Sequence, residues 1–553
     1  MLRPQPIDSI PPETVRVAQA ALPANHRYLG LANELGPLFT DDLFVELFPT
    51  HGQPARAPWR LALVTILQFA EGLSDRPAAA AVRSRIDWKY VLRLELTDPG
   101  FDASVLSEFR GRLLAGDAAT LLFDTLLQWC HEHELVKAGG RQRTDSTHVL
   151  AAVRALNRIE LVGEALRHAL NTLAVLAPEW LAAVSPPEWM QRYARRAEDD
   201  RLPSKQAARD ALVLTIGHDG QTLLAALDDA AAPTWLRYIP ALLRLRQIWI
   251  QNYLWEGTQL QWRANDNIPP AARFISSPYD PDAHYARKGT TQWGGYKAHF
   301  TETCDDEGPP LLTHVETTPG PTADGAVTPR IHAALQQQDL LPKTHMVDTG
   351  FLDAELLSVS QAEYGVDLCG PTRADYHWQS QAKQGFAAHN FQLDWEQQQA
   401  TCPAGKTRLS WSPAVDRGHN PVMKIKFSRK DCGQCAFLAQ CVRSKKPDPR
   451  RTLTVRVEPH YAALQAARVR EATPEFREEY HRRAGMEGTL SRGVRTSRLR
   501  RSPYVGLART HLGQLLVAAG INWLRLGEWF AGRARPKTRR TPFMRLMSGT
   551  LAT

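Results

Sequence analysis

Hydrophobic and polar residues follow two different rhythms along the chain, and these rhythms separate helical regions from sheet-forming ones. Over residues 31–135 the apolar positions recur with the helical period. The clearest unit is a helix over 59–71, which Gly72 stops and which a second helix follows over 74–85. Two helices around a short turn fit a helix-turn-helix that enters a DNA groove. More commonly, such a pair is an ordinary packing unit of a helical domain.

Two stretches show the two-residue period of β-strands. A strand edge is predicted over 142–150, with Asp145 close to a turn. Further along, Tyr296, Ala298 and Phe300 alternate with polar residues, which is typical of a half-buried strand. The run LLTHVETT that follows a short turn supplies a partner strand, so this part of the chain predicts a hairpin.

A strand–turn–helix unit follows in KTHMVDTGFLDAELLSVS. The strand ends at Asp348, Thr349-Gly350 turns the chain, and a helix starts near Leu352. The Asp348 carboxylate is therefore expected at the carboxyl end of a strand, where ligands usually bind in open α/β sheets. A further strand is predicted over 364–369, which gives the chain an α/β core.

Three segments are expected to lie outside this sheet. Residues 1–30 contain several prolines and are expected to be irregular. Residues 157–272 are rich in Leu, Ala, Arg and Glu, with prolines as breaks, and predict an all-α insertion. Residues 531–553 include the run RARPKTRR and are expected to form a basic tail.

Composition and charge narrow the class of protein. A chain of 553 residues is too long for one core, so about two to four domains are expected. No apolar run approaches the length that spans a bilayer, and the first residues lack an apolar signal core, which predicts a cytoplasmic protein without a membrane partner. The net charge is +9, and residues 482–540 hold fourteen Lys and Arg against two acids. Such a concentration favours a polyanion as partner, although a solubilising tail would explain its last part.

Four of the seven cysteines lie close together in the sequence. Cys402 is followed by the group Cys432-x2-Cys435-x5-Cys441. A C-x2-C pair supplies two ligands from one tight turn, and four thiolates complete a closed, structural zinc site. The alternative is a set of reduced, unpaired thiols. Cys130, Cys304 and Cys369 lie in apolar or strand contexts and are expected in the core.

The third candidate acid is Glu487, which stands before a run of arginines. Thr473-Pro474 predicts the start of its helix, with the hydroxyl as N-cap and the proline at the first helical position. Tyr480, Arg483 and Glu487 then share one helical face. Taken alone, Glu487 fits a surface ion pair at least as well as a metal ligand.

Two strand-end aspartates and a helical glutamate can together hold two Mg²⁺ ions on a phosphodiester. Mg²⁺ prefers oxygen ligands and keeps some waters while it bridges substrate phosphates. In this arrangement Lys297 and the arginines near Glu487 would offset the phosphate charge. No spacing rule establishes the trio, because many proteins have acids after strands.

The motifs GRQRTDSTHV, WGGYKAH, VDTGF and Tyr480-x2-Arg483-x3-Glu487 resemble, in this order, bacterial insertion-sequence transposases of the DDE superfamily. The helical N-terminal region and the four-cysteine segment are similar to those of one branch of that superfamily. The block RSPYVGLARTHLGQLLVAAGINWLRL resembles the closing helix of the family. The resemblance extends over about residues 31–530.

The resemblance implies a ribonuclease H-like catalytic core in which Asp145, Asp348 and Glu487 bind Mg²⁺ or Mn²⁺. It implies cleavage at the ends of an insertion sequence and attack of the freed 3′-OH on target DNA. Tyr480 and Arg483 would hold DNA near the cut. Related transposases often carry a lysine seven residues after the Glu; here that position is Val494, so we expect Arg492 or Arg495 to take its DNA contact.

The expected protein is thus a transposase that binds double-stranded DNA at the terminal inverted repeats and at the target, as a homodimer, in the cytoplasm and associated with the nucleoid. A domesticated or structure-directed nuclease and a non-catalytic, zinc-containing DNA-binding protein are the alternatives. The expected fold is α/β, with a helical N-terminal domain, a ribonuclease H-like core, an all-α insertion and a small zinc-binding insertion. The expected ranges are an irregular start (1–30), a helical DNA-binding domain (31–138), the catalytic core (139–156, 273–400 and 455–530), the helical insertion (157–272), the four-cysteine zinc module (401–454) and the basic tail (531–553).

Overall fold

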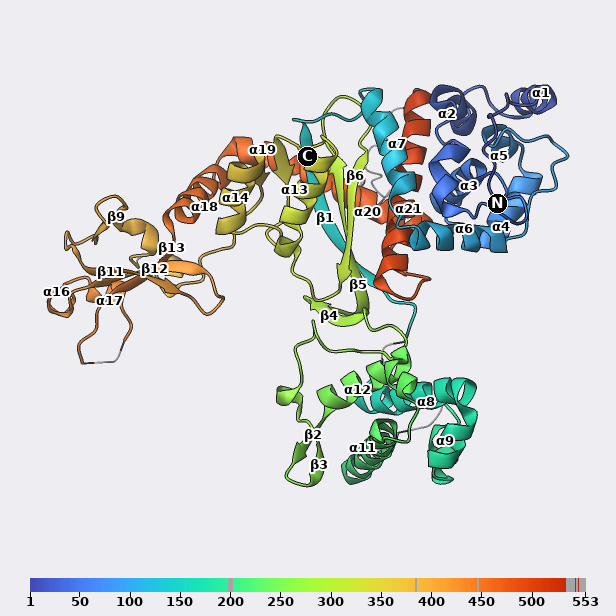
Figure 1. Cartoon of the computed structure of the whole chain (residues 1–553). Coiled ribbons are helices and arrows are strands. Elements are labelled where there is room, and N and C mark those ends of the chain that lie inside the picture. The colour runs from blue at the N-terminus through green and yellow to red at the C-terminus, as the bar shows by residue number, and fades with distance from the viewer. Residues whose placement is uncertain are drawn as a thin grey trace.

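A mixed β-sheet forms the centre of the chain, with helices on both sides of it (Figure 1). The computed structural model describes residues 1–154, 156–196, 202–382, 385–444 and 447–533, together with Phe543 and Leu546. The tail expected over 531–553 therefore lies largely outside the described residues. No helix among the described residues has the length and apolar character needed to cross a bilayer.

The strand order of the central sheet is β4-β5-β1-β7-β8. The strand β6 pairs with β5 on the edge opposite β1, beyond the part of β5 that pairs with β4. β1 runs antiparallel to β5 and parallel to β7, and β7 runs parallel to β8. The predicted hairpin is present as β5 and β6, and the predicted strand over 142–150 is present as β1. The strands are β1 (Arg141–Leu150), β4 (His284–Lys288), β5 (Thr291–Thr303), β6 (Leu312–Pro319), β7 (Thr344–Met346) and β8 (Asp367–Cys369).

The N-terminal region is helical from its twelfth residue, so the irregular start predicted for residues 1–30 is wrong over much of its length. Pro12 is not a breaker but the first residue of α1, where its missing N–H costs nothing. Thr14 anchors this helix, because its hydroxyl donates to the carbonyl of Leu94 at 2.8 Å. The helices are α1 (Pro12–Ala21), α2 (Arg27–Leu35), α3 (Pro58–Glu71), α4 (Asp75–Ser84), α5 (Ile86–Val91), α6 (Ser104–Ala115) and α7 (Leu121–Glu132).

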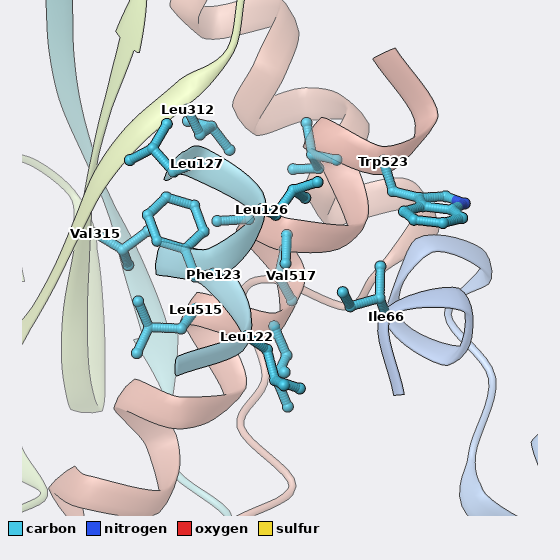
Figure 2. Close-up of a cluster of buried hydrophobic side chains, with 14 of the residues drawn as sticks. Ile66, Leu122, Phe123, Leu126, Leu127, Leu312, Val315, Leu515, Val517 and Trp523 are labelled. Carbon is cyan, nitrogen blue, oxygen red and sulfur yellow. The ribbon is translucent and has the colours of Figure 1, made fainter. Parts of the chain in front are cut away.

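These N-terminal helices and the central sheet share one hydrophobic core. Figure 2 shows Phe123 of α7 beside Val315 of β6, and Ile66 of α3 beside Trp523 of the long helix α21 (Leu507–Phe530). The helix α21 packs directly on β6, where the Asn522 side chain accepts from the N–H of Leu312 at 2.8 Å. The contact between α3 and α21 is close, because a Cβ on Gly520 would lie 2.6 Å from the Ala70 nitrogen. The region expected to be a separate domain is therefore packed into the same core as the central sheet.

The insertion over 157–272 projects from the sheet and has a hydrophobic core of its own (Figure 1). Asn157 begins it with a capping box, in which its side chain accepts from the backbone of Glu160 and the Glu160 carboxylate accepts from the Asn157 N–H. The all-α prediction is wrong at its end, because a two-stranded hairpin packs against the helices. Its elements are α8 (Arg158–Leu176), α9 (Pro178–Val184), α10 (Glu188–Tyr193), α11 (Gln206–Asp228), α12 (Pro240–Asn252), β2 (Tyr253–Glu256) and β3 (Gln259–Trp262).

The cysteine-containing segment forms a second projecting unit, built on the three-stranded sheet β11-β12-β13 (Figure 1). Among its described residues, six buried apolar side chains form one small cluster. Its elements are α15 (Trp378–Gln381), β9 (Gln392–Asp394), β10 (Gln399–Thr401), β11 (Arg408–Val415), β12 (Pro421–Phe427), α16 (Arg429–Gly433), α17 (Leu438–Cys441) and β13 (Thr452–Arg456). The helices that flank the central sheet are α13 (Thr328–Gln337), α14 (Ala354–Tyr364), α18 (Glu458–Glu471), α19 (Pro474–His481), the 3₁₀ turn η6 (Arg482–Ala484) and α20 (Gly485–Thr496).

Candidate active site

Strand register brings Asp145 and Asp348 to the same level of the sheet. Each paired residue of β7 is 203 positions beyond its partner in β1, as in Arg143 opposite Met346, and Asp348 stands at the same offset from Asp145. Partners in parallel strands direct their side chains to the same face. The two carboxylates therefore lie side by side just where the β1–β7 pairing ends. Asp145 itself is in the middle of β1 and not next to a turn, because β1 continues along β5 to Leu150.

One arginine joins the two carboxylates. Nη2 of Arg483 lies 2.9 Å from Oδ2 of Asp145 and 3.9 Å from Oδ2 of Asp348. Its Nε is buried and has no hydrogen-bond partner among the described residues. The guanidinium thus balances the charge of the two aspartates and still has an unpaired Nε–H donor.

The pKa of the Asp145 carboxyl is raised above its usual value. Burial raises its pKa, and the positive charge of Arg483 and the N–H of Ser146 oppose this shift, while the nearby Asp348 adds to it. The pKa of Tyr480 is raised as well, first by burial, and the charges of both aspartates contribute. Two carboxylates, an arginine and a phenol therefore meet in one partly buried site.

The helix over these residues is continuous from Pro474 to Thr496, with η6 as a tighter turn in its middle. Its start is as predicted: the Thr473 hydroxyl accepts from the N–H of Phe476. Tyr480 stacks on Phe476, with ring centroids 5.5 Å apart. Residues three apart on a helix are neighbours, so Arg483 of η6 lies near Tyr480 of α19. The charges of Arg483, Asp348 and Asp145 all act on the Tyr480 phenol, which places this pair beside the two aspartates.

A buried ion network fixes this helix to the sheet. Glu302 of β5 is fully buried and accepts from Arg143 Nε at 2.8 Å, Arg525 Nη1 at 2.7 Å and the Thr489 hydroxyl at 2.8 Å. These groups come from β1, α21 and α20. Arg143 also donates to the carbonyl of Arg482, at the turn that presents Arg483. The network has no local sequence signal, because its members come from four distant segments, and it was not predicted.

Glu487 lies on the exposed side of this helix, one turn beyond Arg483. Side chains four residues apart on a helix are neighbours, so Glu487 stands next to the arginine that contacts Asp145. No hydrogen bond or ion pair joins Glu487 to another described residue. The structure thus brings Asp145, Asp348, Arg483 and Tyr480 into contact range and leaves Glu487 at the rim.

Lys288 and Asp324 also belong to the site, and the sequence did not predict either of them. Nζ of Lys288 lies 3.9 Å from Oδ2 of Asp348 and 3.6 Å from Oδ2 of Asp324. Asp324 is buried, and it accepts from Nζ of Lys297 at 2.9 Å. The motif containing Lys297 was recognised, but the loop carrying Asp324 has no strand or helix pattern that would have marked it.

The basic residues expected to bind DNA occupy different environments. Lys297 is largely buried and donates to Asp324 and to the carbonyl of Thr322 at 2.6 Å. Arg492 pairs with Glu528 of α21 at 3.1 Å. Arg495 is exposed, and its neighbour Val494 packs against the core. Arg483 and Arg495 are therefore the members of this group with donors free for a further contact.

All four clustered cysteines line one small cavity of about 30 Å³. The Lys406 N–H points at the sulfur of Cys402 at 3.4 Å, and the Arg451 N–H points at that of Cys432 at 3.5 Å. Burial raises the pKa of the Cys441 thiol to about 11, and the other three thiols contribute. Cys130, Cys304 and Cys369 are buried, as expected. The four sulfurs are thus gathered in one place, with backbone donors aimed at two of them.

Neither set of predicted ligands is arranged as a finished metal site. Within the part of the chain that the structure describes, no group of three or more His, Cys, Asp or Glu side chains is placed so that it could hold a metal ion. The donor types still suit the expected metals, since Asp145 and Asp348 offer the oxygen ligands that Mg²⁺ prefers and the cysteines offer the thiolates that zinc prefers.

Comparison with known protein families gives two matches. Residues 401–527 match the family described as "Transposase DDE domain", and residues 16–112 match "Transposase domain (DUF772)". The first range contains the cysteines, Glu487 and α21, whereas Asp145 and Asp348 precede it. No curated protein and no solved structure matches the chain. The two matches support a transposase that has a DDE domain and an N-terminal transposase domain, and a DDE domain implies a catalytic, ribonuclease H-like core.

Proposed function

We propose that this protein cuts DNA at the ends of an insertion sequence and joins the freed 3′-OH to target DNA. The observation that carries the proposal is the pairing of Asp145 and Asp348 at one level of the sheet under Arg483, in a chain that matches a transposase DDE domain. The central strand order and the mixed pairing support a ribonuclease H-like core as the scaffold.

In this proposal Asp145, Asp348 and Glu487 hold the divalent metal, Mg²⁺ or Mn²⁺. When bound, such ions activate a water or 3′-OH and stabilise the leaving oxygen of a phosphodiester. Glu487 would reach the aspartates from the neighbouring turn of the helix. Arg483 contacts both aspartates and has an unpaired Nε, so it would also be placed to contact the phosphate.

The residues around this centre would grip the DNA. Arg483 and Tyr480 lie next to the aspartates and would hold the strand near the cut, with Arg492 and Arg495 further along the same helix. A planar guanidinium suits a phosphate because its donors form a fork. Lys297 would act indirectly, by holding Asp324 in place. Asp324 in turn contacts Lys288, which also contacts Asp348.

We further propose that Cys402, Cys432, Cys435 and Cys441 hold a structural zinc. Small units with few buried apolar residues usually need a disulfide or a metal to be stable, and this unit has only a small hydrophobic cluster among its described residues. The four sulfurs share one cavity, and N–H groups point at two of them. In this proposal zinc draws the thiolates together and adds no chemistry to strand cleavage.

The substrate would be double-stranded DNA, with the terminal inverted repeats read by the N-terminal helices and a homodimer formed so that two ends are cut together. On α4 the side chains of Arg76 and Arg83 are exposed and could face DNA, whereas α3 is almost entirely buried and cannot enter a groove. Of the predicted pair, α4 is therefore the helix that we propose contacts the end sequence.

A cleavage assay tests the proposal. Purified protein is incubated with Mg²⁺ and a labelled duplex that contains the sequence flanking its gene, and strand cutting and joining are measured. Asp145→Asn, Asp348→Asn and Glu487→Gln should each abolish cutting and leave duplex binding within a few-fold of wild type. Glu475→Gln, an exposed carboxylate at the start of the same helix, is the matched control and should cut normally.

The alternatives give different outcomes in the same assay. A non-catalytic DNA-binding protein would bind the duplex in a salt-sensitive way and cut none of it. A nuclease would cut without joining the 3′-OH to a second DNA. Normal cutting by Asp145→Asn would overturn the assignment of the metal centre.

A further inference from the structure

A cavity of about 640 Å³ lies where the cysteine unit meets the core, beside the turn that follows Asp348. Leu352 and Asp353 line it, and they begin only four residues after that aspartate. The opposite walls come from α18, from the ends of β12 and β13, and from the segment 373–377. The cavity thus joins the two parts of the chain that bear the predicted metal sites.

Three arginines from three different segments line this cavity. They are Arg373 of the connecting segment, Arg456 at the end of β13 and Arg468 of α18. Among the described residues, none of the three guanidiniums forms a hydrogen bond or a close ion pair, and Nη1 of Arg456 is buried without a partner. Arginines with unused donors in a shared cavity favour a phosphate-bearing ligand.

The two acids of the cavity wall are already engaged. Asp353 caps α14, because its carboxylate accepts from the N–H groups of Glu355 and Leu356 at 2.9 Å. Asp375 accepts from the backbone N–H of His377 at 3.0 Å and contacts its ring at 2.6 Å. Both carboxylates hydrogen-bond within their own loops. Arg468 attracts Asp375 and Arg456 attracts Asp416 only through longer-range charge interactions, so the guanidinium N–H groups remain available to an outside partner.

The same cavity offers surfaces for a base. Tyr376 is 77% exposed, so its ring is available for stacking, and Leu352 and Leu464 provide an apolar wall. Stacking on an aromatic ring combined with arginine contacts to phosphates is the usual way in which proteins hold unpaired strands. The volume fits one nucleotide and is too small for a duplex.

We propose that this cavity binds an unpaired nucleotide of the DNA strand that leads to the scissile phosphate, with Arg373, Arg456 and Arg468 on the backbone and Tyr376 on the base. This inference rests on the proposed function for the identity of the strand. It adds a single-strand subsite between the core and the cysteine unit, which would keep the strand apart from its complement close to the cut.

Binding to a labelled 12-nucleotide single strand, measured by fluorescence anisotropy without divalent metal, tests the subsite in the full-length chain. Arg373→Gln, Arg456→Gln and Arg468→Gln should each weaken binding and reduce the salt slope by about 0.7. Tyr376→Ala should weaken binding on the order of tenfold. Arg273→Gln removes an exposed arginine that directly follows the helical insertion, and it should change neither quantity.

A second measurement locates the contact directly. A strand that carries iodouridine is irradiated on the protein, and the crosslinked peptide should contain Tyr376. Unchanged binding by Arg373→Gln and Tyr376→Ala, which lie on an exposed segment and need not disturb folding, would overturn the proposal. So would a crosslink confined to other parts of the chain, or displacement of the strand by free deoxynucleotide at equal concentration, which would make the cavity a mononucleotide site.

The two proposals fail separately. Normal strand binding by the cavity variants, combined with loss of cutting in Asp145→Asn, removes the subsite and leaves the transposase assignment. Normal cutting by Asp145→Asn, combined with a crosslink at Tyr376, removes the metal centre and leaves the cavity as a single-strand site.

Discussion

The guanidinium of Arg483 lies 2.9 Å from the carboxylate of Asp145, which ties the helix of Glu487 to the central strand at the candidate metal centre. Burial raises the pKa of Asp145, and Arg483 lowers it again. Removing the guanidinium by Arg483→Ala should therefore raise the pKa of Asp145 and move the acid limb of the cleavage pH profile to higher pH. Cleavage at the optimum should fall on the order of 100-fold, because the strand is no longer positioned.

Single-turnover cleavage rates between pH 5.5 and 9 measure both effects. Arg482→Ala is the neighbouring control, since the Arg482 side chain pairs with Asp306 and Glu479 at the surface. It forms no ion pair with Asp145 or Asp348 among the described residues. The Arg482→Ala change should leave the acid limb in place. An Arg483→Ala enzyme with the wild-type pH profile would mean that this arginine does not control the charge of Asp145.

Two glycines of α20 predict opposite responses to the same substitution. A Cβ on Gly485 would collide with the guanidinium of Arg143, whereas one on Gly488 would meet nothing within 4 Å. Gly485→Ala should therefore displace Arg143 from Glu302 and from the carbonyl of Arg482, and so destabilise the fold and impair cleavage. Gly488→Ala should be neutral or stabilise the protein by up to about 1 kcal/mol, because alanine favours the helix.

Urea unfolding and strand cleavage, measured side by side on the two variants, check this pair. Loss of a buried network of this kind typically costs about 3–5 kcal/mol when one charge is left without its partner. Equal stability and activity of the two variants would show that the Arg143 contact does not hold the helix in place.

The buried histidines predict a loss of stability on the acid side. Burial lowers the pKa of His332 to about 4 and that of His345 well below its usual value of 6.5. Below pH 6.5 the unfolded chain takes up protons that the folded chain excludes, so the free energy of unfolding should fall as the pH drops from 6.5 towards 4. Each histidine contributes up to about 1.4 kcal/mol per pH unit.

Urea denaturation at several pH values between 4.5 and 7.5 measures this slope. His332→Gln removes one of the two groups and should make the slope shallower, even though the variant is less stable at neutral pH. His218→Gln changes an exposed histidine of the insertion and should leave the slope unchanged. Equal slopes in wild type and His332→Gln would contradict the prediction.

Because the four cysteines share one cavity, we expect the stability of the cysteine unit to depend on bound zinc. Cys435→Ser should remove bound zinc and make the region over 385–456 sensitive to protease, because its small core is left without a crosslink. Zinc content by mass spectrometry and limited proteolysis measure the two effects. Cys130→Ser, a change in the main core, should keep the zinc. Wild-type protein that is free of zinc and still resists protease would exclude a structural metal.

Local chemistry was enough to predict many elements of this fold. Gly72 ends α3 in the left-handed conformation and Thr473 caps α19, as their residue types require. The alternation of Tyr296 and its neighbours predicted β5. These features depend on a few adjacent residues, and so a single sequence reveals them.

Features that depend on distant partners were not predictable in this way. Glu302 reads as a polar residue near a turn, and only Arg143, Thr489 and Arg525 make its burial possible. Asp324 becomes part of the site through lysines on β4 and β5. Likewise the free guanidiniums of the cavity beside α14 come from three segments that meet only in the folded chain.

The close approach of Gly520 to Ala70 bears on the distance between the proposed DNA-reading helix and the proposed cleavage site. The helices that match a transposase N-terminal domain pack against α21 and share one hydrophobic core with the central sheet. A sequence read by α4 is then held at a set distance from the Asp145–Asp348 pair. The proposed cut would therefore fall a constant number of base pairs from the sequence that α4 contacts.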